Sequence, residues 1–307
     1  MTGRVVLLGV FVADTAYRAD RAPRMGETVL ARGFALGPGG KGSNQAVAAA
    51  MAGAETHIIT RLGRDPFAEM ALATWARAGV VPAVTHHPDS YTGAAYIFVE
   101  HGTGDNAIII APGAAAGIGE DDVAARAALI EGADVFVTQL EQPVPAALAA
   151  LRLARGAGVT TILNPAPAAP LPEGMLALCD YVTPNESEAE GLTGLRVTNP
   201  SEAEAAARAL RAGGAGAAIV TLGAQGVLFH DGARTVHVPA MPAGPVVETT
   251  GAGDAFNGGF AAALAAGLDP VAAVRFGCAT AGISVTRAGT APSMPARVEI
   301  EALLARH

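Results

Sequence analysis

The chain has 307 residues, of which 51% are hydrophobic and 16% charged, and its formal net charge is −8. This length and apolar content suffice for a large buried core, in one large or two modest domains. Only 20 Lys and Arg are dispersed along the chain, which excludes a richly basic surface for nucleic acid or anionic membranes and favours small-molecule chemistry.

The amino-terminal segment MTGRVVLLGVFVAD contains a short apolar run that ends at Asp14. The run is too short for a secretory signal with its cleavage site or for a membrane span, and we interpret it as a first strand. The two cysteines, Cys179 and Cys278, lie in apolar surroundings and are too few for a disulfide framework or a thiolate metal site. We therefore expect a cytoplasmic protein without a membrane or nucleic-acid partner.

Short β-branched runs alternate with longer alanine-rich amphipathic segments along the rest of the chain. The strand candidates, in order, are RVVLLGVFV, THIITRL, DVFVTQL, VTTILN, DYVTPN, AAIVTLG and GVLFH. The helix candidates are residues 43–52, 66–78, 121–131, 145–157, 201–212, 254–266 and 270–286. Strands separated by helices indicate a largely parallel sheet with helices on both faces, joined by right-handed crossovers. We therefore expect an α/β fold.

Two segments depart from this alternation, at about residues 13–37 and 91–111. The first carries Pro23, Gly26 and Gly33 around the strand-like ETVLARGF, and the second contains TGAAYIFVE and NAIIIA around an HGTGD turn. Together they predict a small β-sheet outside the main layer. Set over the carboxyl ends of parallel strands, such a sheet would form a lid on a ligand site. The proline-rich stretches are local loops, so residues 1–307 form one domain in this interpretation.

The first motif that suggests chemistry is GPGGKGSNQA. Its letters match the dinucleotide fingerprint G-x-G-x-x-G, but Pro38 interrupts the turn and no acidic residue follows about 20 positions on. A Walker A loop also fails, because Gly42 stands where Ser or Thr should follow Lys41. Two interpretations remain: a glycine turn that brings backbone donors, Lys41 and Asn44 to a polyhydroxylated ligand, or a tight loop capped by Ser43 at a helix start.

The second motif is ETTGAGDAFNGG, in which Asp254 follows three small residues and precedes an alanine-rich helix. The small residues Gly251, Ala252 and Gly253 allow backbone N–H groups to converge, and the helix adds the positive end of its dipole. The motif therefore predicts an anion site beside a carboxylate. The alternative is that Asp254 simply caps the helix.

Together the two motifs resemble the signatures of the ribokinase-like sugar kinases, the phosphofructokinase-B family. GGKGSNQAVAA is similar to the first signature and TTGAGDAFNGGF to the second. LNPAPA, TPNESEAEGLTG and VTLGAQGV lie between them and AVRFGCATAGISVTRAGTAPSMP follows, in the order and spacing of bacterial ribokinases, so the likeness covers nearly the whole chain. The resemblance implies a three-layer ribokinase-like fold and an ATP-dependent kinase. Its leading acceptor is D-ribose, converted to D-ribose 5-phosphate, or a related sugar, and the lid often pairs two copies into a homodimer.

The resemblance also implies roles for individual residues. Asp254 would be the base near the attacking hydroxyl, and Gly251, Ala252 and Gly253 would donate N–H groups to the passing phosphoryl group. The residues that fall where ribokinases hold the sugar hydroxyls are Asp14, Gly39, Gly40, Lys41, Asn44 and Glu141. Ribokinases usually have Asn where this chain has Val12, and the loss of that polar contact predicts an altered sugar preference.

On the nucleotide side, the resemblance implies Asn185 and Glu188, an N-x-x-E motif that organises Mg²⁺ mostly through water. The other residues it places beside ATP are Thr221, Gly223, Gly226, Gly253 and Cys278. It further implies an activating K⁺ ion beside the anion site, held by groups from Glu248, Thr250, Ser284, Arg287, Gly289 and Ser293. The family more often has Asp at the position of Glu248, and the longer side chain is expected to displace or weaken the ion.

Two other functions remain open from the sequence. A nucleoside kinase of the same fold needs an apolar shelf for the base, to which Val12, Phe98 and Ile110 are candidates. A catalytically silent sugar-binding regulator would carry a damaged phosphoryl site, whereas Asp254 and its neighbouring glycines are intact.

Overall fold

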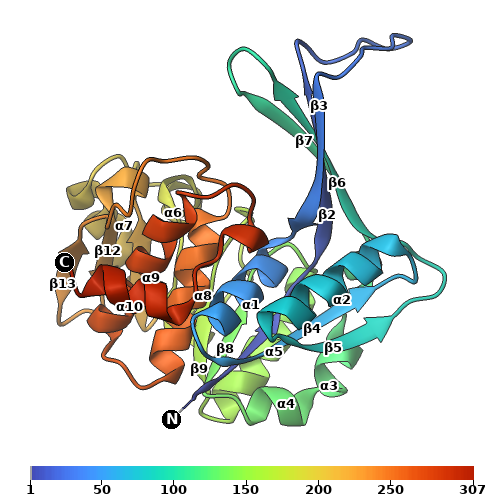
Figure 1. Ribbon diagram of the computed structural model, residues 1–307. Coiled ribbons are helices and arrows are strands. Elements are labelled where there is room, and N and C mark those ends of the chain that lie inside the picture. Colours follow the sequence, from blue (N-terminus) through green and yellow to red (C-terminus); the bar gives the residue numbers. More distant parts are fainter. Residues whose placement is uncertain (1) are drawn as a thin grey trace.

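The computed structural model describes residues 2–307, which form two β-sheets and the helices around them (Figure 1). The larger sheet has nine strands in the order β13-β12-β11-β10-β9-β8-β1-β4-β5. They are β1 Arg4–Leu8, β4 Glu55–Leu62, β5 Val81–His86, β8 Val135–Thr138, β9 Thr160–Leu163, β10 Tyr181–Val182, β11 Ala217–Thr221, β12 Val227–His230 and β13 Thr235–Val238. Pairing is parallel from β5 across to β11, and β12 runs antiparallel to both neighbours. The mostly parallel sheet predicted from the sequence is confirmed.

Helices cover both faces of this sheet. Successive side chains of β1 point to opposite faces and are buried on both, so each face needs a helical layer. Val5 and Leu7 pack with one group of helices, and Val6 and Leu8 with another. The first group is α1 Lys41–Met51, α2 Pro66–Ala78, α8 Ala252–Ala265, α9 Pro270–Ser284 and α10 Arg297–Leu304. The second face is covered by α3 Glu120–Ala124, α4 Ala127–Glu131, α5 Val144–Gly156, α6 Glu186–Thr193 and α7 Pro200–Ala212. A strand buried on both faces reads as a continuous apolar run, which is why β1 was recognisable in the sequence.

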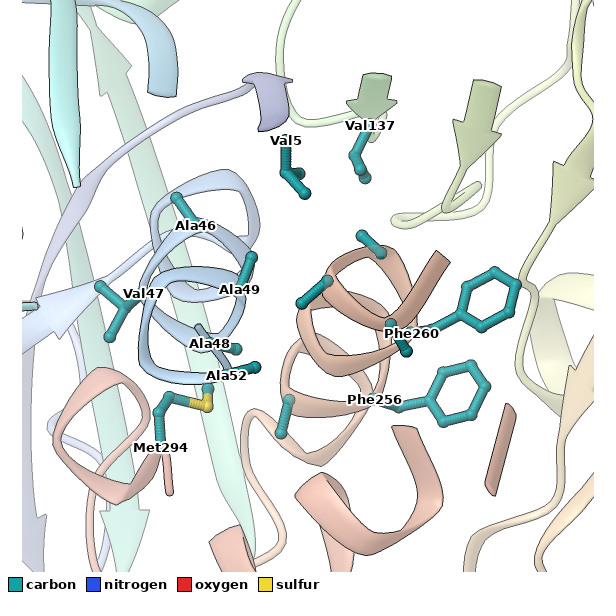
Figure 2. Packing of buried hydrophobic residues seen from close by; sticks show 14 of the residues in the cluster. Val5, Ala46, Val47, Ala48, Ala49, Ala52, Val137, Phe256, Phe260 and Met294 are labelled. Carbon is teal, nitrogen blue, oxygen red and sulfur yellow. The ribbon is translucent and has the colours of Figure 1, made fainter. Parts of the chain in front are cut away.

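Helices α1 and α8 lie unusually close together (Figure 2). A methyl group placed on Gly258 of α8 would be 2.4 Å from the Cβ atom of Ala48 and 2.6 Å from the carbonyl oxygen of Gln45. Phe256 and Phe260 project from α8 on the side away from α1 and stack with ring centroids 5.9 Å apart. The small residues on the facing sides therefore set the spacing of the two helices that carry the two signature motifs.

The smaller sheet rises from the body as a long twisted ribbon (Figure 1). Its order is β3-β2-β6-β7, with β2 at Val12–Ala19, β3 at Gly33–Gly39, β6 at Thr92–Glu100 and β7 at Asn106–Gly113. Pro38 and Pro112 lie in the two edge strands, where a missing N–H group is tolerated. The predicted second sheet is confirmed, but ETVLARGF was wrong as a strand because β3 begins only at Gly33. The expected glycine turn is also corrected, since residues 37–39 end that strand.

Several boundaries differ from the sequence prediction. The helix expected at 121–131 is two short helices, α3 and α4, and the strands β5 and β13 and the helices α6 and α10 were missed. β5 is an edge strand with a largely exposed, proline-containing sequence, so it carries little hydrophobic signal. Among residues 2–307, none of the helices combines the length and apolar character needed to cross a membrane.

Candidate active site

Two helices begin at the base of the small sheet with no side-chain cap. α1 follows Gly40, whose φ is 88°, and α8 follows Gly251, whose φ is 81°. Four other helices, α2, α6, α7 and α9, are capped by an Asp or Asn side chain. The uncapped first turns leave backbone N–H donors at the positive ends of two helix dipoles. A methyl group on Gly253 would meet no atom within 4 Å, so the start of α8 faces open space in which an anion fits.

Asp254 lies in the first turn of α8 and is only 7% exposed. Its Oδ2 accepts a hydrogen bond of 2.9 Å from Asn44 Nδ2, and its Oδ1 accepts one of 3.1 Å from Gln45 Nε2. Burial raises the pKa of Asp254, and the charge of Lys41 and the two amide donors act in the opposite direction. The residue that caps the helix is Gly251, so the interpretation of Asp254 as an N-cap was wrong. The structure therefore shows a buried carboxylate at the start of α8 that is held by two amide donors.

The residues expected on the sugar side lie around this carboxylate. The backbone N–H of Lys41 donates a 2.8 Å hydrogen bond to Glu141 Oε2. Asp14 packs so closely on Gly39 that a methyl group there would lie 2.2 Å from Asp14 Oδ2. Asn44 Oδ1 is buried without a hydrogen-bond partner among the described residues. Since buried acceptors are normally satisfied, the oxygen indicates a place for a donor such as a sugar hydroxyl.

Carboxylates outnumber cations in this region. Burial, followed by the charges of Asp254 and Glu248, raises the pKa of Asp14 to about 6. Burial is also the main cause that raises the pKa of Glu141 to about 7, with Asp254 and Asp14 adding to it and Lys41 opposing it. Three carboxyl groups, of Asp14, Glu141 and Asp254, therefore lie within electrostatic reach of one another with Lys41 as the opposing cation, and a bound cation would offset their excess negative charge.

The nucleotide-side residues are brought together by the main sheet. Asn185 forms an isolated parallel bridge with Thr221, and the Thr221 N–H donates a 2.9 Å hydrogen bond to the Pro184 carbonyl. Asn185 and Glu188 cap α6 reciprocally, at 2.8 and 2.9 Å. Burial raises the pKa of Glu188, which also feels the charges of Lys41 and Asp254. The N-x-x-E motif therefore borders both the TLGAQG turn and the buried carboxylate.

Glycines shape the turn beside this motif. Gly223 and Gly226 have φ values of 51° and 90°, which only glycine adopts readily. A methyl group on Gly226 would lie 2.1 Å from the Val238 carbonyl oxygen. The backbone of this turn is therefore tight and accessible to a ligand at Gly223, where the same test finds only Glu186 at 4.0 Å.

Most groups expected around K⁺ gather next to the start of α8. Glu248 Oε2 accepts a 2.8 Å hydrogen bond from the Gly289 N–H, which leaves its second oxygen for a cation. The hydroxyl of Ser293 donates to the Thr290 carbonyl at 2.7 Å, and that of Ser284 donates to the Ala281 carbonyl at 2.9 Å. Both hydroxyl oxygens keep lone pairs, and the Thr250 carbonyl precedes Gly251 directly. This set of oxygens suits a monovalent or other hard cation.

The side chain of Arg287 does not belong to this group. Its guanidinium pairs with Glu299 and lines a separate surface hollow of about 410 Å³. Only the backbone of Arg287 can therefore serve a cation. In residues 2–307, no group of three or more His, Cys, Asp and Glu side chains is arranged to hold a metal. A divalent ion at Glu188 would accordingly be held largely by water and ligand oxygens, which is how Mg²⁺ commonly binds.

Three other expectations need correction or qualification. Cys278 is 5% exposed in α9, its burial raises the pKa of the thiol to about 12, and it packs as a core residue. Val12 is also 5% exposed and belongs to the core, although it shares the face of β2 that carries Asp14. Phe98 was wrong as a member of the apolar shelf for a nucleoside base, because it points to the face opposite Asp14, whereas Val12 and Ile110 lie on the Asp14 face.

Sequence reasoning missed three polar residues. Gln45 contacts Asp254 directly, Asn164 contacts Gln45 at 3.0 Å, and Thr290 contacts the base of the small sheet. Signals for them existed, because Gln45 follows Asn44 in the first motif, Asn164 begins NPAPA after a strand, and Thr290 lies in the loop with the expected cation groups. Their partners are far away in sequence, so no local pattern identified the contacts.

Comparison with known proteins agrees with this geometry. Residues 3–297 match the sequence model of the pfkB family of carbohydrate kinases. A ribokinase of Staphylococcus aureus (strain COL) is 36% identical over 304 residues, which cover 98% of this chain and 99% of that protein. A bifunctional ribokinase/ribose-5-phosphate isomerase A of Fructilactobacillus sanfranciscensis is 37% identical over 300 residues, and the chain spans 55% of that longer protein.

Among solved structures, the Arabidopsis thaliana ribokinase complexed with ribose and ATP superposes with a TM-score of 0.93 at 30% identity, covering 99% of both chains. The match extends over both sheets and over the two signature helices, not over a single motif. The chain belongs to the pfkB family of carbohydrate kinases, phosphotransferases that act on sugars.

Proposed function

We propose that the protein transfers the γ-phosphoryl group of ATP to the 5-hydroxyl group of D-ribose. The O–H bond of the sugar breaks as its proton passes to Asp254, the new O–P bond forms, and the bond from the γ-phosphorus to ADP breaks. The observation that carries the proposal is the buried Asp254 carboxylate at the uncapped start of α8. The full-length likeness to ribokinases supports ribose as the acceptor.

The remaining residues have roles in positioning and charge. The N–H groups of Gly251, Ala252 and Gly253 bind the migrating phosphoryl oxygens. The acceptors of Asp14 and Glu141 and the unpartnered Asn44 Oδ1 hold the sugar hydroxyls. ATP lies along the side formed by Asn185, Thr221 and Gly223. Alignment of the sugar and ATP, with water excluded, supplies most of the acceleration in such a site.

Two cations complete the proposal. Mg²⁺ would be organised by Glu188 and the ATP phosphates, where it neutralises charge on the nucleotide. K⁺ would be held by Glu248 and the carbonyl and hydroxyl oxygens around Thr250 and Ser293. The carboxylate excess around Asp254 supports both cations.

We further propose that the small sheet is a lid over the sugar and that its outer face pairs with a second copy of the chain. The residues opposite the Asp14 face, related by the strand register, include Tyr17, Phe34, Leu36, Tyr96 and Ile109, which are 36–68% exposed. Tyr17 lies 5.0 Å from Phe34 and 5.5 Å from Tyr96 between ring centroids. An apolar aromatic face of this kind marks a surface that is covered in the working protein. The two free, buried cysteines fit a reducing cytoplasm.

The test is ADP release with ribose, deoxyribose, other pentoses, hexoses, sugar phosphates and nucleosides as acceptors. We expect ribose to give the highest kcat/KM, and a nucleoside in first place would contradict the proposal. Asp254→Asn should lower kcat about 10²- to 10⁴-fold, the usual contribution of a general base. Asp269→Asn changes another carboxylate at a helix start, which caps α9 and pairs with Arg234 on the surface, and serves as the matched control.

A further inference from the structure

The carboxylate of Asp254 is contacted by a residue that has no other evident part in the reaction. Gln45 is fully buried in α1 and donates from Nε2 to Asp254 Oδ1 at 3.1 Å. A glutamine amide can present either its NH₂ group or its carbonyl oxygen in the same place, and only the NH₂ group stabilises a carboxylate. The hydrogen-bond partners of Gln45 determine whether its NH₂ group or its carbonyl oxygen points toward Asp254.

The orientation of the Gln45 amide is set first by a backbone carbonyl group. Asn164 Nδ2 donates to the Thr183 carbonyl oxygen at 3.0 Å, and that oxygen can only accept. Asn164 Oδ1 must therefore point the other way, where it accepts from Gln45 Nε2 at 3.0 Å. The Gln45 NH₂ group has two hydrogens, so it serves Asn164 and Asp254 together.

The other side of Gln45 agrees with this orientation. Its Oε1 accepts from Gln139 Nε2 at 2.6 Å. A reversed Gln45 amide would place its oxygen against the oxygens of Asn164 and Asp254. Both contacts would become repulsive at once, among side chains that are buried from water.

A second backbone carbonyl closes the network into a ring. Asn257 Nδ2 donates to the Gly253 carbonyl at 2.9 Å, so its Oδ1 turns to accept the Thr183 hydroxyl at 2.6 Å. Thr183 and Asn257 are each 1% exposed. The ring therefore leaves α8 at Asp254, passes through α1 and the ends of β9 and β10, and returns to α8 one residue before Asp254.

We infer that Gln45 is a positioning residue whose amide, oriented by the Thr183 carbonyl through Asn164, holds Asp254 ionised and fixed for proton transfer. The inference rests on the proposed role of Asp254 as the base. Asn44 differs from Gln45, because its free Oδ1 faces a possible substrate position while Gln45 has no unused polar atom. The charged groups that influence Asp254 or are influenced by it are Lys41 of α1, Asp14 of β2, Glu141 after β8 and Glu188 of α6.

The test compares Gln45→Met and Gln45→Glu with Gln142→Met. Gln142 is a matched control, since it is 2% exposed and donates only to Thr138 and to the Gln139 carbonyl. The kcat for ribose is measured from pH 5 to pH 9, together with KM for ATP and the melting temperature. Loss of a donor to the carboxylate should move the acidic limb of the kcat profile of Gln45→Met upward by about one pH unit. The fall in kcat should then be about tenfold larger at the acidic end than at the alkaline plateau, with KM for ATP within about twofold of wild type.

Gln45→Glu keeps the size of the side chain and should shift the limb further, because it sets a second carboxyl group against Asp254. It also carries the test if Gln45→Met does not fold. An equal loss of kcat at every pH, or an equal shift in Gln142→Met, would overturn the inference. If the wild-type protein itself shows no acceptor-dependent ADP release, the proposed function fails and not the role of Gln45 within it.

Discussion

The hydroxyl group of Thr290 donates a 2.8 Å hydrogen bond to the backbone carbonyl of Pro38, 252 positions away in the chain. Thr290 is 8% exposed, and its Cβ and methyl carbon would lie 3.3 Å from a methyl group placed on Gly251. One side chain thus joins the base of the small sheet to the residue that starts α8. The small sheet is therefore fastened to the start of α8 through the loop that follows α9.

Thr290→Val should loosen this connection. The substitution keeps the shape of the side chain but leaves the Pro38 carbonyl without its donor, at a cost of about 1–3 kcal/mol. We expect the KM for the sugar to rise about tenfold, within that range, while kcat changes much less. Thr290→Ser should restore the wild-type value. Thr286→Val is the control, because Thr286 follows α9 and its hydroxyl contacts only the Ile283 carbonyl near the end of that helix. An equal rise in KM there would refute the link.

The stability of the unliganded protein should fall as the pH rises from about 4.5 to about 7. Glu141 has a folded-state pKa of about 7 against 4.5 ordinarily, so the folded state retains a proton that the unfolded state has lost. Its contribution is complete below the unfolded pKa and is lost as the pH passes through the folded one. Between about pH 4.5 and pH 7, the decrease in the free energy of unfolding should be about 1–3 kcal/mol smaller in Glu141→Gln than in the wild-type protein. Urea unfolding at several pH values measures it, and an unchanged slope in the variant would exclude Glu141 as the cause.

Val12 should influence the choice of sugar because it shares the Asp14 face of β2. Val12→Thr keeps the volume and replaces a methyl group with a hydroxyl group, which should change the ratio of kcat/KM values for ribose and deoxyribose by about 5- to 150-fold, equivalent to about 1–3 kcal/mol. Val12→Ala, which removes apolar contact without adding polarity, is the comparison. If both variants lower the two values in parallel, Val12 only fills the core.

Potassium activation should depend on the charge of Glu248. Glu248→Gln retains an oxygen for the Gly289 N–H, so the loop should keep its shape while the cation loses a carboxylate ligand. Rates in equal concentrations of KCl and NaCl give the measurement. We expect K⁺ to stimulate the wild-type protein and to have little effect on the variant. Stimulation of equal size in both proteins would place the ion elsewhere.

The outer face of the small sheet should control the oligomeric state. Tyr17→Lys puts a charge at the centre of the aromatic cluster, so we expect a wild-type dimer to become a monomer in sedimentation velocity. Val298→Lys alters a valine of α10 that is 71% exposed and should leave the dimer intact. A monomeric wild-type protein would contradict the proposal that this face pairs with a second copy of the chain.

The sequence was sufficient for features that depend on short-range patterns. The apolar run of β1 and the alternation of strands with alanine-rich helices predicted the parallel sheet, because a strand buried on both faces has a strong local signature. The edge strand β5 lacks that signature and was missed. ETVLARGF has suitable residues for a strand, yet the ladder with β2 begins only at Gly33. Strand pairing between distant segments decided that boundary.

The candidate site shows the same division. Asp254, Asn44 and Lys41 were recognisable within two motifs whose glycines and polar residues are concentrated in a few positions. The roles of Gln45, Asn164 and Thr290 arise from contacts across 119 to 252 positions. The face of the sheet on which Phe98 lies depends on register, which no local pattern supplied. Contacts of this kind become visible only when the chain is folded.

The close packing of α1 and α8 at Gly258 makes the two signature motifs depend on each other structurally. Asn44 and Gln45 reach Asp254 across 210 and 209 positions only because the backbone of α8 comes so near to α1. Even an alanine at this position would push the helices apart. The amide groups of Asn44 and Gln45 would then move away from Asp254, although no polar group is changed. Transplanting either motif alone into another scaffold should for this reason yield an inert protein, since the working unit is a matched pair of helices at a fixed separation.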